Sequence, residues 1–397
     1  MPRRAVLVLV ALAGVALLWW ASGLGRPSVD PSRYFDPEQI ARANAYRHPR
    51  YWAIAGATVL NLAVLAILAF TPLGDRLVRG SWPWPLAALA AGVLVPVVLA
   101  LVRLPISFWL GHVHEQAWGF STQSAWGWLG DWVRSIGIAA VIGGGLYTGL
   151  IALIRWLPRG WPLAAGAGIA GAVVLFSFVW PVLVEPVFND FRPMADREQR
   201  AELLALADEA GAPVSEVLVA DQSRRTTKEN AYVSGFGSTK RIVVWDTLLD
   251  RASFEEVKLV AAHELGHRRF GHVEWGTAIG AVASALGVGV LWWLLRAPGV
   301  LGAARATSVA DPRIIPLVIL AATVMTLITA PVANRISRAF EARADRFALE
   351  LTGDRETYVA AQRGLALRNL ADLDPGPIAY RFVYTHPPAA ERVSYAD

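Results

Sequence analysis

The stretch from Ala261 to His272, AAHELGHRRFGH, contains residue types and spacings suited to metal-dependent hydrolysis. His263 and His267 are four positions apart, so on a helix both imidazoles project from one face and can bind one ion. Glu264, next to the first histidine, can then reach a water molecule beside that ion as a general base. The chain has no cysteine, so histidine and carboxylate side chains must supply the ligands. The pattern predicts one catalytic Zn²⁺ per chain.

A catalytic zinc needs a third protein ligand and leaves its fourth position to water. The best candidate is Glu341, in SRAFEARADRFALELTG, a stretch expected to be a helix that leaves the last apolar run and stops at Gly353. Asp345, one turn later on the same face, could accept the free N–H of a liganding imidazole and fix its tautomer. The alternative is an exposed acidic pair in salt bridges with the arginines of this stretch, Arg338, Arg343 and Arg346.

The composition predicts that these residues belong to an integral membrane protein. Of the 397 residues, 55% are hydrophobic and only 17% are charged, and the mean hydropathy is +0.40. An ordinary soluble protein of this length is less apolar. The net charge of +5 comes mainly from scattered arginines, without the clustered basic and aromatic face of a nucleic-acid binder. We therefore expect a lipid bilayer and a peptide or protein substrate as partners, and no nucleic acid.

Apolar runs of spanning length number about seven, since a helix needs about 20 residues to cross the hydrocarbon core. They lie near 5–22, 51–71, 82–102, 135–156, 161–183, 277–295 and 314–333. The first run could instead be a cleaved signal peptide, because MPRR supplies a positive start, although it lacks a clear cleavage site. The expected fold is a multi-pass α-helical membrane protein with a small α+β zinc metallopeptidase domain.

Two polar stretches flank the last two runs and must lie on one side of the membrane, so together they can form one domain. The predicted division is a five-span membrane domain (1–184), the first half of the zinc-site domain (185–276), a two-span hairpin (277–334) and the second half of the zinc-site domain (335–397). In the first half, DREQRAELLALADEAG predicts a helix ending at Gly211. SEVLVAD, NAYVSG and KRIVVWD predict strands, the last two joined by the turn FGST.

The helix that carries the histidine pair should begin at Ser253, with Glu256 three residues later completing a capping box. If that helix continues into the run near 277, a helical hairpin through the membrane would bring His267 and Glu341 to similar heights. The long sequence separation between the two ligands would then be the length of the hairpin.

Several motifs together resemble the type I CAAX prenyl proteases, integral-membrane zinc metalloproteases to which the HtpX proteases are related. HELGH and FEARAD resemble the zinc-site pair of that family, ENAYVSGFGSTKRIVVWDTLL its NAY segment, and THPPAAERV its C-terminal motif; EPVFNDFRP and WGFSTQS are further similarities. The resemblance covers residue 35 to the C-terminus. It implies a ring of seven helices around a large chamber, with His263, His267 and Glu341 as ligands, Glu264 as base and Asp345 as support.

The C-terminal motif and the NAY segment contain further candidate residues. His386 and Arg392 could stabilise the oxyanion of the tetrahedral intermediate; otherwise they are a turn histidine and a surface arginine. The segment Asn230, Ala231 and Tyr232 could bind an extended substrate by main-chain hydrogen bonds if its strand has a free edge. The alternative is an interior hairpin strand without a ligand.

The substrate stays open at this level. Hydrolysis of membrane-associated or lipidated peptides ranks above a prenyl-specific role, and HtpX-like quality control of membrane proteins or a non-enzymatic scaffold with a structural zinc are the alternatives. Arginines at 26, 33, 42, 47 and 50 crowd the loop expected after the first run and favour a cytoplasmic active site, while Arg3 and Arg4 favour the opposite orientation. The oligomeric state cannot be inferred.

Overall fold

The computed structural model describes residues 29–78, 82–235 and 240–397. The first predicted run (5–22) and the predicted turn FGST lie outside these residues. The chain divides into two compact units. The site unit comprises Met1–Tyr51, Trp180–Trp275 and Thr326–Asp397, and the helical unit comprises Trp52–Val179 and Gly276–Met325. The four-segment domain division inferred from hydropathy stays a prediction.

Six helices among the described residues are long and apolar enough to cross a membrane: Pro37–Phe70, Trp84–Ala117, Ala125–Trp156, Trp161–Phe188, His272–Leu295 and Pro312–Thr352. They correspond to the six predicted runs from residue 51 onward, so the multi-pass helical fold is confirmed. One expectation about them is wrong. Helix α2 (Pro37–Phe70) already begins at Pro37, so Arg42, Arg47 and Arg50 lie on this helix and not in a loop.

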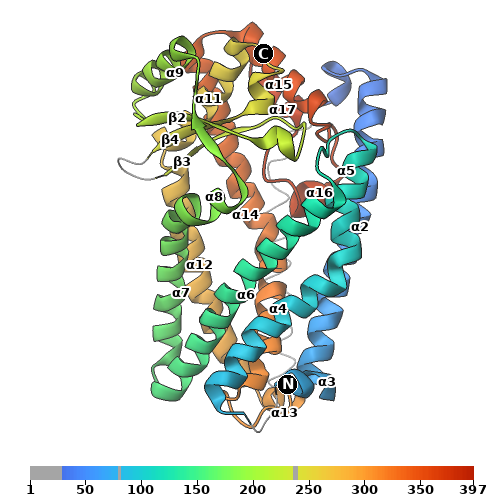
Figure 1. Cartoon of the computed structure of the whole chain (residues 1–397), viewed down its shortest axis with the longest axis vertical. Helices are drawn as coiled ribbons and strands as arrows, with labels where there is room; N and C mark the ends of the chain where they lie inside the picture. Colours follow the sequence, from blue (N-terminus) through green and yellow to red (C-terminus); the bar gives the residue numbers. More distant parts are fainter. Residues whose placement is uncertain (1–28, 79–81, 236–239) are drawn as a thin grey trace. The chain divides into compact units, whose positions relative to one another are not determined.

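Within the helical unit, α4 (Trp84–Phe108) and α6 (Ala125–Trp156) pack closely because glycines face each other (Figure 1). A Cβ on Gly92 would lie 2.8 Å from the carbonyl oxygen of Gly143, and one on Gly143 would lie 2.7 Å from that of Gly92. Such contacts between small residues hold helices together in lipid, where apolar burial gives no drive to associate. This unit also contains α3 (Pro72–Leu77), the π-helix η2 (Trp109–Val113), α5 (His114–Ala117), α7 (Trp161–Val179), α13 (Val300–Ala303) and the 3₁₀-helix η6 (Pro312–Ile314).

The site unit contains a four-stranded sheet in the order β1-β2-β4-β3. The strands are β1 (Phe191–Pro193), β2 (Glu216–Ala220), β3 (Ala231–Ser234) and β4 (Arg241–Trp245). The three predicted strands are present, and β1 is an addition. β4 pairs in parallel with β2 and antiparallel with β3, which leaves β3 at an edge of the sheet. The apolar run from Ile242 to Val244 in β4 is fully buried, as expected for a central strand.

Two helices of the site unit follow their sequence signals closely. Helix α9 (Arg197–Glu209) ends just before Gly211, whose φ of +64° suits a residue without a Cβ. Helix α11 (Phe254–Arg269) begins with the predicted capping box between Ser253 and Glu256. Figure 1 shows both helices beside the sheet, where the apolar side chains of α11 join one core with those of α9, β2 and β4.

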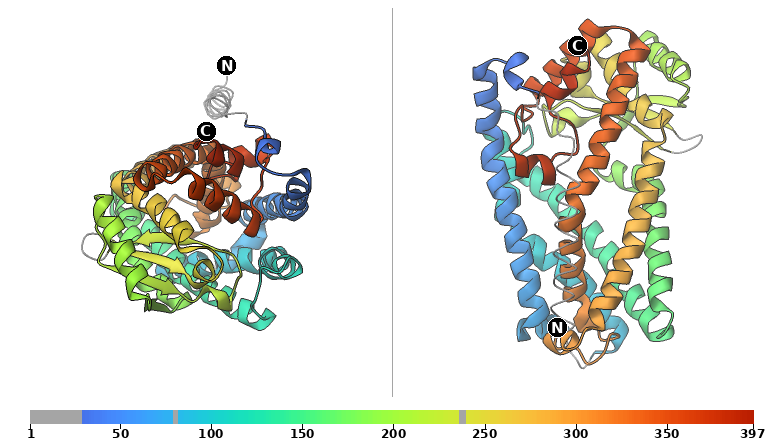
Figure 2. Two further views of the ribbon diagram at one scale, coloured as in Figure 1. Left: turned by 90° about the horizontal axis from the view of Figure 1, so that it is seen from above. Right: turned by 180° about the vertical axis from the view of Figure 1, so that it is seen from behind.

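The two helices that carry the predicted ligands behave differently at their ends. α11 does not continue into α12 (His272–Leu295), because Gly271 adopts a φ of +63° and breaks the helix. The expected uninterrupted helix through His267 is therefore wrong. In contrast, α14 (Ile315–Thr352) is continuous past Glu341 and ends before Gly353, as predicted (Figure 2, right). The chain closes with α15 (Arg355–Arg368), α16 (Pro377–Phe382) and α17 (Ala389–Ser394).

Candidate metal centre

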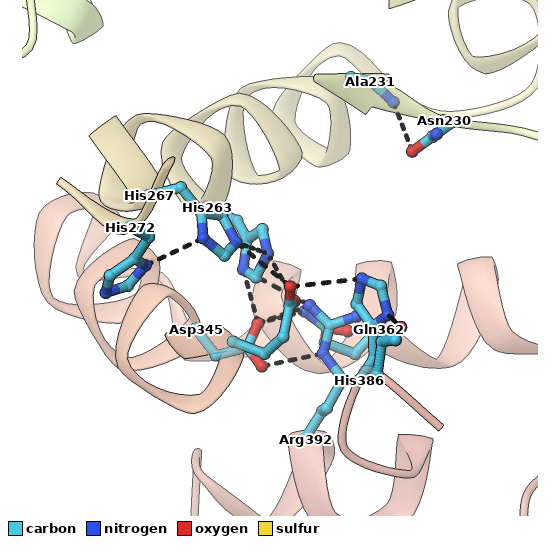
Figure 3. Close-up of polar contacts among 11 residues, drawn as sticks. Asn230, Ala231, His263, His267, His272, Asp345, Gln362, His386 and Arg392 are labelled. Atoms are coloured by element: carbon cyan, nitrogen blue, oxygen red, sulfur yellow. Dashed lines mark hydrogen bonds and ion pairs between the residues drawn. The ribbon is translucent and has the colours of Figure 1, made fainter. Parts of the chain in front are cut away.

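Three side chains of the site unit form a cluster that could hold a metal ion: His263 and His267 from α11, and Glu341 from α14. One ligand atom of each lies within 4.8 Å of the others. The two histidine Nε2 atoms are 3.1 Å apart, and they lie 3.2 Å and 3.5 Å from the Glu341 carboxylate oxygens. His263 and Glu341 are buried. Figure 3 shows both imidazoles turned toward this point.

The glycine of HELGH lets the two ligand-bearing helices approach. A Cβ on Gly266 would lie 3.0 Å from Cδ1 of Phe347 and 3.2 Å from Cα of Ala344. Ala344 and Ala348, one and two turns along α14 from the ligand position, are fully buried. Gly266 was not singled out from the sequence, although it lies inside the motif, because its importance depends on what α14 presents to it.

Asp345 orients the first histidine. Its Oδ1 lies 2.9 Å from Nδ1 of His263, and its carboxylate is fully buried. Arg392 donates two hydrogen bonds to it, Nη2 to Oδ1 at 2.6 Å and Nε to Oδ2 at 2.9 Å. Gln362 adds a third, at 3.3 Å. A carboxylate on the outer nitrogen of an imidazole fixes which ring nitrogen is free to bind a metal.

The alternative explanation of the acidic pair, salt bridges to the arginines of its own helix, is wrong. Arg338 donates to the carbonyl oxygens of Tyr380 and Tyr384. Arg343 and Arg346 lie instead over the rings of Phe270 and Tyr395. Asp345 takes its arginine from the C-terminal helix α17, which the sequence did not indicate.

Burial and neighbouring charges shift the pKa values on α11 and α17. Burial alone would lower the pKa of His263, but the carboxylates of Asp345 and Glu341 together outweigh it and raise that pKa to about 10. Burial raises the pKa of Glu264, which moves this carboxyl toward the range of a general base. For Arg392, Asp345 outweighs the effect of burial and raises the guanidinium pKa.

The two residues of the C-terminal motif both lie at the cluster. Nε2 of His386 is 3.4 Å from Oε1 of Glu341, and its side chain is 58% exposed. Arg392 is turned toward Asp345, and its Nη2 lies 3.5 Å from Nδ1 of His263. His386 is therefore accessible to solvent, whereas the guanidinium of Arg392 is hydrogen-bonded to Asp345, on the far side of His263 from Glu341 (Figure 3).

The three candidate substrate-binding residues lie at the start of the edge strand, and Figure 3 shows Asn230 and Ala231 beside α11. Asn230 accepts a hydrogen bond from the backbone of Trp245, so Asn230 and Tyr232 turn their main-chain groups toward β4. Ala231 and Val233 then turn theirs to the outer edge. The Ala231 N–H is held at 3.0 Å by the Asn230 side chain, and the Tyr232 hydroxyl donates to Glu185 at 3.3 Å.

Helices of spanning length, and a largely buried cluster of the two HExxH histidines with a glutamate from α14, define an integral, multi-pass membrane metallopeptidase. Residues 193–397 match the model of Peptidase family M48, and residues 28–190 match the CAAX prenyl protease N-terminal domain with its five membrane helices. The chain thus belongs to Peptidase family M48 and is a metalloendopeptidase, which confirms the resemblance seen in its motifs.

Curated relatives match over most of the chain. A Bacillus subtilis protein named uncharacterized metalloprotease YhfN is 29% identical over 93% of this chain and 88% of its own length. CAAX prenyl protease 1 homolog of Oryza sativa is 30% identical over 77% of this chain and 72% of its own length. CAAX prenyl protease 1 of Saccharomyces cerevisiae is 28% identical, over 77% and 70%.

A solved structure has the same fold. The crystal structure of S. mikatae Ste24p superposes with a TM-score of 0.83 at 23% identity and covers 98% of both chains. The similarity therefore extends over the spanning helices as well as the peptidase region.

Proposed function

We propose that this chain is a zinc endopeptidase that holds one Zn²⁺ with His263, His267 and Glu341. The geometry of the cluster carries the proposal. Ligand atoms at zinc-bond distances on a tetrahedron are separated by about 3.3 Å, and the three separations here are 3.1, 3.2 and 3.5 Å. Two imidazoles and one carboxylate are also the ligand set of many catalytic zinc sites, which keep one position for water.

In this proposal each residue around the cluster has a separate role in peptide hydrolysis. Zinc, when bound, supplies Lewis-acid polarisation of a water molecule and of the scissile carbonyl. Glu264 takes the proton of the attacking water and later delivers it to the leaving amine. His386, exposed next to Glu341, donates from Nε2 to the developing oxyanion. Arg392 acts instead through Asp345 on His263, a change from the oxyanion role expected from the sequence.

The outer edge of β3 binds the substrate backbone in this proposal. The carbonyl of Ala231 and both main-chain groups of Val233 point away from β4 and can pair with an extended peptide. Asn230 orders the start of the strand through its bond to the Ala231 N–H, and Tyr232 secures the strand to Glu185. Such pairing binds the peptide through its main-chain groups, so it selects only weakly among substrate side chains.

The substrate class we favour is membrane-associated peptides and proteins in general. Spanning helices keep the enzyme where such substrates are concentrated. The names of the yeast and rice relatives support CAAX-type processing of prenylated substrates as a second candidate, whereas the name of the Bacillus relative does not mention CAAX processing. Cleavage of matched peptides with and without a prenylated cysteine separates the two. Degradation of an unfolded membrane protein would favour a quality-control role.

The catalytic proposal is tested by Glu264→Gln, which keeps the size of the side chain but removes the base. Zinc should stay at about one per chain while hydrolysis falls by on the order of 10²-fold or more. Glu255→Gln, at an exposed position of the same helix, is the matched control and should cleave at the parent rate. Parent-like cleavage by Glu264→Gln would refute the role of Glu264, and a zinc-bound parent that cleaves no peptide would favour a structural zinc.

We propose further that the active site is cytoplasmic. Arg33, Arg42, Arg47 and Arg50 belong to the site unit, as does the metal cluster, and positive charges next to spans favour the cytoplasmic side. A reporter fused after Asp397 should therefore read as cytoplasmic. A clear external signal would overturn this orientation.

A further inference from the structure

His272 lies next to the second histidine of the cluster, although the sequence analysis gave it no role. It is the first residue of α12, directly after the break at Gly271. Its Nδ1 is 2.9 Å from Nδ1 of His267. Its ring stacks on Phe340, with centroids 4.3 Å apart and an interplanar angle of 2°. The side chain is buried, so packing fixes the orientation in which it meets His267 (Figure 3).

The direction of the hydrogen bond between the two rings follows from the position of the metal cluster. Nε2 of His267 faces His263 and Glu341, so this nitrogen is the ligand atom and must be unprotonated when a metal is bound. The hydrogen of the neutral ring is then on Nδ1. Nδ1 of His272 lies within hydrogen-bond distance and has to accept it.

We propose that His272 is a positioning residue, a neutral imidazole that accepts the Nδ1–H of His267 and thereby fixes the tautomer and ring orientation of this ligand. The inference rests on the proposed zinc site and adds a residue to it. The break at Gly271 makes this arrangement possible, because it turns the chain so that His272 faces back toward α11.

The two zinc ligands on α11 would then be supported by different chemistry. His263 donates to a buried carboxylate that Arg392 also binds, whereas His267 donates to an uncharged ring. A carboxylate acceptor makes an imidazole a more basic ligand. A neutral acceptor orients the ring without adding a second negative charge, which leaves the ion a stronger Lewis acid.

The test uses full-length protein and two substitutions at one position. His272→Phe keeps an aromatic ring to stack on Phe340 but removes the acceptor. His272→Asn keeps an acceptor, because Oδ1 of asparagine and Nδ1 of histidine are both bonded to Cγ. His48→Phe, at an exposed position of α2, is the control. Zinc affinity is measured by competition with a chelator, the visible spectrum of the Co²⁺-loaded protein reports ligand geometry, and the melting temperature of the metal-free protein reports the fold.

The expected result is that His272→Phe binds zinc about 10- to 100-fold more weakly and changes the Co²⁺ spectrum, with the metal-free melting temperature unchanged. His272→Asn should recover most of the affinity and the parent spectrum. Parent-like affinity in His272→Phe, or equal defects in both variants, would overturn the inference while leaving the zinc site intact. A parent protein that binds no zinc would overturn the proposed function and, with it, this inference.

Discussion

Two pairs of histidines in this chain differ in what their spacing allows. His263 and His267, four positions apart on α11, bring their rings to 4.8 Å and face Glu341. His112 in η2 and His114 in α5, two positions apart, pack at a tilt against different aromatic rings, those of Phe108 and Trp109. A separation of two places side chains on different sides of a helix, whereas a separation of four stacks them on one face. Buried histidine by itself therefore does not indicate a metal site.

The two histidine pairs also differ in whether a separate helix supplies a carboxylate beside them. Within residues 29–78, 82–235 and 240–397, the only His, Asp and Glu group with metal-ligand geometry is the one on α11 and α14. Glu115, next to the other pair, belongs to the same helical segment as the histidines and does not join them in such a group. A ligand that approaches from a separate helix can meet both rings at once.

The largest effect is expected from removing that carboxylate. Glu341→Ala or His263→Ala deletes one of the three proposed ligands, so both bound zinc and hydrolysis should be lost, and the site unit should become easier to unfold because the proposed ion would connect α11 with α14. Metal analysis and a peptide-cleavage assay measure this. A variant that kept one zinc per chain would show that the ligands are elsewhere.

A smaller loss is expected at His386, which approaches the cluster from its exposed side. Its replacement by alanine should lower kcat by roughly 10²- to 10³-fold, the usual cost of removing one oxyanion donor, with little change in KM or zinc content. Steady-state kinetics with metal analysis separates these quantities. A variant that loses zinc with kcat per bound ion unchanged would make His386 a structural residue.

Replacing Asp345, which contacts His263, should lower zinc affinity more than it lowers the rate of hydrolysis per bound ion. Asp345→Asn removes the charge that orients His263 and leaves the guanidinium of Arg392 without its partner. Zinc affinity should fall by about 10- to 100-fold. Asp208→Asn, at an exposed position of α9, is the control for loss of one negative charge. Equal zinc affinity in both variants would show that the carboxylate does not orient the ligand.

The smallest effect is expected at the other histidine pair. His112→Phe keeps the buried aromatic contact with Phe108 and removes Nδ1, a buried atom without a hydrogen-bond partner. Zinc content and cleavage rate should equal those of the parent, and the same two assays apply. Loss of zinc in this variant would contradict the distinction between the two pairs.

The features that the sequence predicted well are local ones. The capping box at Ser253, the helix ends at Gly211 and Gly353, and the common face of His263 and His267 each depend on residues within about one or two turns. The spanning helices from residue 51 onward could be predicted equally well, because a run of about 20 apolar residues suffices to cross the hydrocarbon core. Glu341 was chosen because few histidines remain in the chain and because a helical hairpin would bring this carboxylate to the height of His267.

Contacts between distant segments were decided only by the tertiary structure. The pairing of Arg392 with Asp345, the packing of Gly266 against Ala344 and the parallel pairing of β2 with β4 each join residues that are far apart in the sequence. Closing a loop costs entropy that depends weakly on its length, so sequence separation hardly limits which pairs form. Complementary shape and charge in the packed protein determine which residue pairs form. The acceptor for His267 shows this at short range: Gly271 could have continued the helix, and the left-handed turn there places His272 against the ligand.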